Sequence, residues 1–141
     1  MLYALCILLT AVLIGAAAHE LSHAAALEWF GIEYTIEWFP ARADGRLRMA
    51  IEPHWATVTY QAIPSDVQAW KLRVAAIMPL VLALPLVPMA IGVLPDPIGT
   101  ENLYLSLAII GWLACAIPSP ADFAIFWHPE RSLARWRAKT D

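Results

Sequence analysis

Three long stretches without a charged side chain constrain this chain more than any other feature of its sequence. They cover residues 2–18, 74–94 and 103–118. A helix of about 20 apolar residues, rising 1.5 Å per residue, crosses the ~30 Å hydrocarbon core of a bilayer. The 141-residue chain is 60% hydrophobic and 15% charged, which leaves too few polar side chains to cover a soluble globule. The sequence therefore predicts an all-α integral membrane protein with about three transmembrane helices, folded as one membrane-embedded domain over residues 1–141.

The ends of the three spans follow from local signals. The first helical pattern continues through AAALEWF to Gly31, a typical helix C-cap, which gives a span over residues 2–30. The third pattern passes the Pro-Ser-Pro sequence and predicts a span over 103–127. The second span, 74–94, contains three prolines, which predict kinks and backbone carbonyls that need other partners: Pro79, Pro85 and Pro88.

The segment between the first two spans, about residues 32–60, has a different periodicity. Apolar and polar side chains alternate over 32–38 and again over 46–52, and an Asp44-Gly45 turn signal lies between the two runs. This pattern predicts a small β-hairpin. Val58 and Tyr60 could add a short third strand.

Basic residues predict the orientation of the spans. Five of the nine lie between spans one and two, four lie in the tail 128–141, and the sequence PDPIGTEN between spans two and three has none. Because basic residues concentrate in cytoplasmic loops, we expect a multi-pass protein with the β-hairpin and basic tail in the cytoplasm and the N-terminus outside. The N-terminal run lacks the positive start of a signal peptide, which favours a retained span over a cleaved one.

The sequence HELSH at residues 19–23 places ionisable groups at the end of the first apolar run. Positions i and i+4 share a helix face, so His19 and His23 can direct two imidazoles at one metal ion. Glu20, one residue along, can reach a water molecule there as general base. The motif predicts a zinc metalloprotease of the HExxH type with one catalytic Zn²⁺.

A catalytic zinc site usually has three protein ligands, so a third must lie elsewhere. Counted along a helix, His19 and Asp122 lie about 26 Å and 28 Å from the outer ends of their spans, and so at one depth. A carboxylate in the hydrocarbon costs about 2.5–3.5 kcal/mol on insertion scales, and a metal ion would offset that cost. The alternative for Asp122 is a helix cap after the Pro-Ser-Pro break. His54 and His128 are the competing ligands.

These features together resemble the site-2 protease family of intramembrane zinc metalloproteases, or related small zincin-type membrane peptidases. The resemblance rests on HELSH at the end of the first span, the hairpin after FGIEYTIEWF, the second span entered through KLRVAAIMPL, and an Asp in a later span. It implies that His19, His23 and Asp122 bind zinc and that Glu20 is the catalytic base. It also implies hydrolysis of a peptide bond in a membrane protein or peptide substrate by metal-activated water.

Two other functional classes remain open on the sequence alone. The chain could be an inactive pseudoprotease that binds membrane proteins, or a small metal-handling membrane protein; the intact Glu20 argues against both, since neither function needs a base. A net charge of −3 without a basic patch excludes nucleic acid as a partner and leaves the lipid bilayer, a substrate and a homo-oligomer. Cys6 and Cys115 differ in depth by about 10 Å, too far for a disulfide, and are expected to be free.

Overall fold

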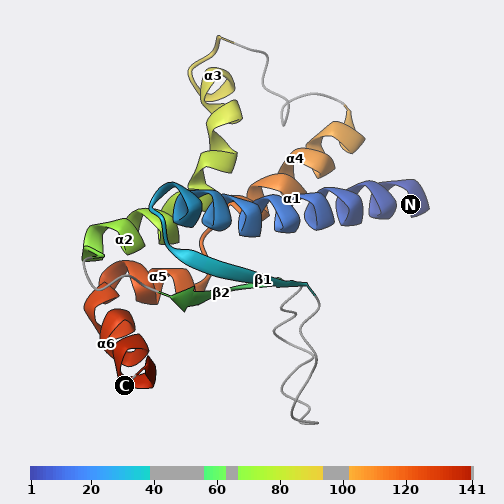
Figure 1. Ribbon diagram of the computed structural model, residues 1–141. Helices are drawn as coiled ribbons and strands as arrows, with labels where there is room; N and C mark the ends of the chain where they lie inside the picture. The colour runs from blue at the N-terminus through green and yellow to red at the C-terminus, as the bar shows by residue number, and fades with distance from the viewer. Residues whose placement is uncertain (39–55, 63–66, 94–101, 141) are drawn as a thin grey trace.

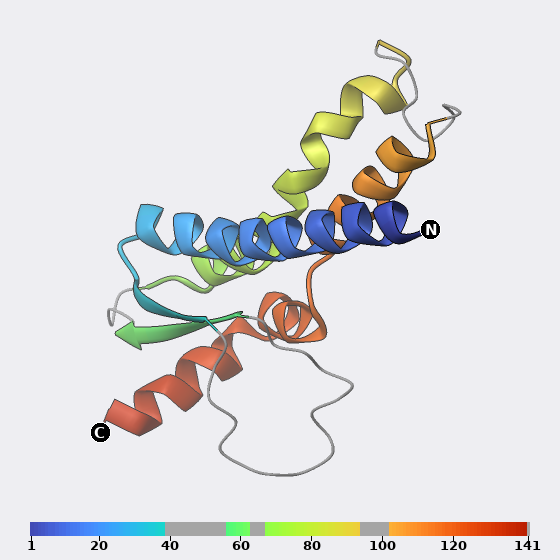
Figure 2. The ribbon, with the colours of Figure 1, turned by 90° about the vertical axis from the view of Figure 1, so that its right-hand side faces the viewer.

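The computed structural model describes residues 1–38, 56–62, 67–93 and 102–140. The elements, in chain order, are α1 (Leu2–Trp29), β1 (Glu33–Trp38), β2 (Ala56–Ala62), α2 (Ala69–Ile77), the 3₁₀ helix η2 (Met78–Leu86), α3 (Val87–Ala90), α4 (Leu103–Ala116), α5 (Pro120–Trp127) and α6 (Pro129–Thr140). The long helix α1 crosses the molecule (Figure 1). Two views agree that α3 and α4 extend on one side of α1, whereas β1, β2, α5 and α6 lie on the other (Figures 1 and 2).

Three segments are long and apolar enough to cross a membrane, as the sequence predicts. They are Leu2–Trp29, Ala69–Ala90 and Leu103–Trp127. Most of their side chains are not buried inside the protein, which is the expected state of helices that face lipid. The predicted class is therefore confirmed: a mainly helical protein with three candidate membrane spans and a small antiparallel sheet between the first two.

The end of α1 forms a Schellman motif in which Phe30 is the C-cap and Gly31, the predicted C-cap, is the residue directly after it. The N–H of Ile32 donates to the carbonyl of Leu27 at 2.9 Å, and the N–H of Gly31 donates to Glu28 at 3.0 Å. Gly31 has φ +67°, a conformation that costs glycine little. Leu27 and Ile32 are both buried, and this apolar contact fixes the direction in which the chain leaves α1.

The sheet pairs β1 with β2 in antiparallel register, with Ile36 opposite Val58 and a bulge between Glu33 and Tyr34. The first predicted strand is confirmed. Its partner is the segment around Val58, which the sequence suggests only as a third strand; the predicted turn at Asp44-Gly45 and the run 46–52 lie outside the described residues.

The second span is broken, as its prolines predict. The α-helix ends at Ile77, and residues 78–86 continue as a 3₁₀ helix that contains Pro85. Pro85 has no N–H to donate to the carbonyl of Leu82, its 3₁₀ partner. The indole N–H of Trp112 donates to that carbonyl instead, at 2.8 Å. The freed carbonyl therefore finds its partner on α4, as an apolar surrounding requires.

The third span is two helices rather than the one continuous helix expected from the sequence. Ile117, with ψ 124°, leaves the helical conformation at the end of α4, because the proline that follows disfavours that conformation. Ser119 then caps α5, which begins at Pro120. Figure 2 shows that α5 runs in a different direction from α4.

Two glycines let α1 and α4 approach closely. A methyl group added to Gly15 would lie 2.9 Å from Cβ of Cys115, and one added to Gly111 would lie 3.1 Å from Cβ of Ala11. Small residues at such crossings are typical of membrane helix pairs. The contact fixes the height of Cys115 relative to α1.

The apolar core lies beyond the histidine motif, at the C-terminal end of α1. There α1, the start of β1, α2 and α6 pack together, and the buried side chains belong to Ala26, Leu27, Ile32, Val67, Leu72, Ala75 and Leu133. This core anchors α2 and α5 against the helix that carries the motif.

Candidate metal centre

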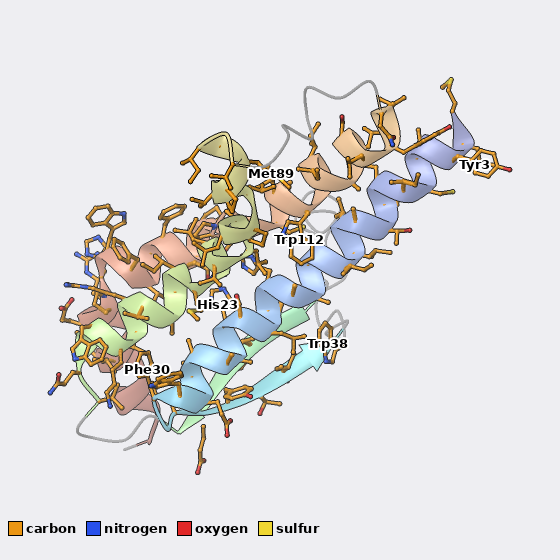
Figure 3. All side chains as sticks on the ribbon, turned by 90° about the horizontal axis from the view of Figure 1, so that it is seen from above. Tyr3, His23, Phe30, Trp38, Met89 and Trp112 are labelled. Carbon is orange, nitrogen blue, oxygen red and sulfur yellow. The ribbon has the colours of Figure 1, made fainter. Side chains whose placement is uncertain are left out.

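The predicted histidine pair lies on one face of α1. His19 and His23 are one helical turn apart, and their Nε2 atoms approach to 3.2 Å. Their rings meet nearly edge to face, with an interplanar angle of 78°. Figure 3 shows His23 on the side of α1 that faces α2. The helical spacing predicted for two ligands of one ion is therefore present.

Asp122, on α5, completes the group. Its Oδ2 lies 3.5 Å from Nε2 of His19, and its Oδ1 lies 3.3 Å from Nε2 of His23. One ligand atom from each of the three residues can be chosen so that all lie within 4.8 Å of one another. The predicted trio is thus brought together from α1 and from a helix about 100 residues later in the chain, and it can hold a metal ion.

Two backbone carbonyls orient the imidazoles. Nδ1 of His19 lies 2.7 Å from the carbonyl oxygen of Cys115, and Nδ1 of His23 lies 2.7 Å from that of Ala75. A carbonyl oxygen only accepts, so each Nδ1 must carry the proton and donate it. In the neutral ring this leaves Nε2 as an unprotonated lone pair, which is the form that binds metal.

The donor set fits a cation. Two Nε2 lone pairs and a carboxylate converge, and three such electron-rich groups repel one another unless a positive charge lies among them. Ligand atoms about 2.0–2.1 Å from a tetrahedral zinc ion lie about 3.3–3.4 Å from each other. The separations of 3.2, 3.3 and 3.5 Å match that spacing, although the two histidines approach different oxygens of Asp122.

The three side chains are largely shielded from solvent. The exposed fractions are 12% for His19, 10% for His23 and 13% for Asp122. Shielding strengthens the attraction between these groups and a cation. Glu20 lies on α1 next to His19 and is partly exposed, which is compatible with the position of a base beside the group.

Asp122 also has the capping role that was the alternative to metal binding. Its Oδ2 accepts the N–H of Ser119 at 2.7 Å, and its own N–H donates to Oγ of Ser119 at 3.2 Å. This is a capping box, with Ser119 as the N-cap and Asp122 three residues later. The two interpretations are combined in one side chain rather than exclusive.

The competing ligands do not join the group. His128 is exposed at the C-cap of α5 and is not part of the metal-binding group found among the described residues. His54 lies outside the described residues. Both cysteines are free, as expected; Sγ of Cys115 donates to the carbonyl of Val12 at 3.4 Å, and its backbone carbonyl serves His19.

Sequence reasoning missed the orienting carbonyls of Cys115 and Ala75 and the cap at Ser119. The available signal was the position of the prolines, because Pro118 and Pro79 each follow one of these carbonyls by a single turn.

No family model, curated protein or solved structure matches the chain.

Proposed function

We propose that the chain is a zinc-dependent membrane peptidase similar in its site to the site-2 proteases. The observation that carries the proposal is the convergence of His19, His23 and Asp122, on a helix where Glu20 follows the first ligand directly. Two imidazoles and one carboxylate are a frequent ligand set of catalytic zinc, and three protein ligands leave a fourth position for a water molecule or a substrate.

The roles of the residues follow from their chemistry. A bound zinc ion would polarise the scissile carbonyl and activate a water molecule. Glu20 accepts the proton of the attacking water and delivers it to the leaving amine. The carbonyls of Cys115 and Ala75 hold the two imidazoles in the tautomer that binds metal.

The position of the site favours a membrane-bound substrate. His19 and His23 lie in the second half of a helix that is apolar from its beginning, and β1 begins at Glu33, just after that helix ends. A peptide bond at the edge of the hydrocarbon would reach this level when its helix unwinds. With the hairpin and tail in the cytoplasm, the site would lie near the cytoplasmic face, where water is available for hydrolysis.

The test combines metal analysis with cleavage. Purified wild-type protein and Glu20→Gln are compared in liposomes with a panel of single-span substrates, and zinc is measured in both. Glu28→Gln is the matched control, because Glu28 is an exposed residue of the same helix. We expect equal zinc in all three proteins and cleavage only by the wild type and the control, since glutamine cannot accept a proton.

Two results would contradict the proposal. Wild-type protein that binds zinc yet cleaves no substrate would favour a binding protein. Cleavage by Glu20→Gln at the wild-type rate would remove Glu20 from the mechanism.

A further inference from the structure

The two carbonyls that orient the histidines are each followed by a proline at helical spacing. In a continuous helix, a carbonyl at position i accepts the N–H of residue i+4, or of i+3 in a 3₁₀ turn. Proline has no N–H. A proline at either position therefore leaves the carbonyl with accepting capacity for another donor.

The carbonyl of Ala75 loses its α-helical donor in this way. Position i+4 is Pro79, the second residue of η2. The N–H of Met78 donates to Ala75 from the i+3 position, and a carbonyl oxygen has a second lone pair. The Nδ1–H of His23 takes that lone pair at 2.7 Å.

The carbonyl of Cys115 loses both helical donors. Position i+3 is Pro118, which has no N–H, and position i+4 is Ser119, whose N–H donates to Asp122 at 2.7 Å. The Nδ1–H of His19 donates to the freed carbonyl at 2.7 Å. The break between α4 and α5 thus frees the carbonyl that accepts from His19, and it also frees the N–H of Ser119 that holds the carboxylate of Asp122 in place.

A third proline gives an internal comparison. Pro85 frees the carbonyl of Leu82, but that carbonyl accepts the indole of Trp112 and no histidine. Pro85 therefore frees a carbonyl for a side-chain donor in the same span as Pro79, but away from the metal centre. A change at Pro85 measures the general effect of removing a proline, without an effect on the histidine ligands.

We propose that Pro79 and Pro118 are positioning residues of the metal centre. Each withholds the N–H that would compete for the carbonyl of Ala75 or Cys115, so that His23 and His19 keep Nδ1 protonated and Nε2 directed at the ion. This inference rests on the proposed metal site and explains why its two histidine rings have their observed orientation. The prolines act through the histidines and touch no reacting atom.

The test uses Pro79→Ala and Pro118→Ala in the full-length protein, with Pro85→Ala as the control. The first readout is ¹⁵N NMR of histidine ring nitrogens in the metal-free protein at alkaline pH, which reports which nitrogen carries the proton. We expect Pro79→Ala to change the signals of His23, Pro118→Ala to change those of His19, and Pro85→Ala to change neither. A variant that merely misfolds would alter both histidines.

The second readout is zinc affinity by competition with a chelator. Partners behind a ligand are typically worth about 10- to 100-fold in metal affinity, and we expect a loss of that size for Pro79→Ala and Pro118→Ala and none for Pro85→Ala. A further variant carries lactate in place of alanine at position 79, so that an ester oxygen replaces the N–H. We expect the ester to restore the affinity lost in Pro79→Ala.

The outcomes separate this inference from the proposed function. If wild-type protein binds no zinc, the proposed function fails, and the ring-nitrogen signals of the metal-free protein still decide the role of the prolines. Unchanged signals of His19 and His23 in both proline variants would overturn the inference, as would an ester variant as weak as Pro79→Ala.

Discussion

The N–H of Ser119 donates to Oδ2 of Asp122 at 2.7 Å, and the N–H of Asp122 donates back to Oγ of Ser119 at 3.2 Å. The carboxylate that closes this helix cap is the one that faces His19 and His23. The cap therefore sets the direction of the third candidate ligand before any ion binds. A preorganised ligand loses little conformational entropy on binding, which favours affinity.

The first prediction separates ligand from cap at Asp122. Asp122→Asn keeps an oxygen that can accept the N–H of Ser119, so the cap should persist and the thermal midpoint should change little. The amide lacks the negative charge of a ligand. Loss of a group that only hydrogen-bonds to a ligand typically lowers metal affinity roughly 10- to 100-fold, and zinc affinity should fall by more than that here. Asp122→Ala should lose both the zinc and, through the cap, about 1 kcal/mol of stability.

His128→Ala and His54→Ala are the controls for this series, measured by chelator competition and thermal unfolding in detergent. Both should bind zinc as the wild type does, because His128 is not part of the group and Asp122 already supplies the third position. Full zinc affinity in Asp122→Asn together with its loss in either histidine variant would reassign the third ligand.

The second prediction concerns the contact between Gly15 and Cys115. A methyl group on Gly15 would lie 2.9 Å from Cβ and 3.0 Å from Sγ of Cys115. Gly15→Val should push α1 and α4 apart, cost about 1–3 kcal/mol of stability by overpacking, and weaken zinc binding by separating His19 from its carbonyl partner. Thermal unfolding and zinc titration measure the two effects.

Ala25→Val is the matched control, since it adds bulk at an exposed position of α1. The double variant Gly15→Ala with Cys115→Gly moves the clashing volume from one helix to the other and should bind zinc better than Gly15→Ala alone. Equal loss in the single and double variants would show that packing at this crossing does not control the site.

The third prediction tests the broken second span. Trp112→Phe removes the indole N–H that donates to the carbonyl of Leu82 at 2.8 Å. An unpaired buried carbonyl costs about 1–3 kcal/mol, so the thermal midpoint should fall. Trp70→Phe is the control, because Trp70 is 49% exposed and water can replace its bond to Gln68. A midpoint as low in the control would mean that ring size, rather than the hydrogen bond, matters.

Local patterns were sufficient to predict much of the fold. The uncharged runs predicted the three spans, Gly31 predicted the end of α1 close to its last residue, Trp29, and the i, i+4 spacing predicted the histidine pair. Each of these depends on residues close in sequence. The pairing of β1 with residues 56–62 depends on a long connection, and no local signal sets that register.

Asp122 was predicted to join the histidines because it lies at the same depth as His19. That prediction assumed one continuous helix for the third span, which the structure does not have. It counted residues along one continuous span, whereas the chain breaks at Ile117 and the capping box at Ser119 directs the carboxylate. The prolines at 79 and 118 mark the carbonyls of Ala75 and Cys115 as free to accept a further hydrogen bond, but not their partners, because the histidine that reaches each one lies about 50 or 100 residues away in the chain. Only the tertiary fold brings them together.

The last prediction concerns orientation in the membrane. Basic residues flank the sheet region and fill the tail, and the sequence between α3 and α4 has none. Reporter fusions after Gly45, Ile98 and Asp141 should therefore read inside, outside and inside. The uneven distribution of basic residues can be reduced by changing Lys71 and Arg73 to Gln and adding two lysines between α3 and α4. This change should weaken the preference for the predicted orientation. An inside reading after Ile98 in the unmodified chain would contradict the span assignment, and with it the placement of His19 and Asp122 near the cytoplasmic face.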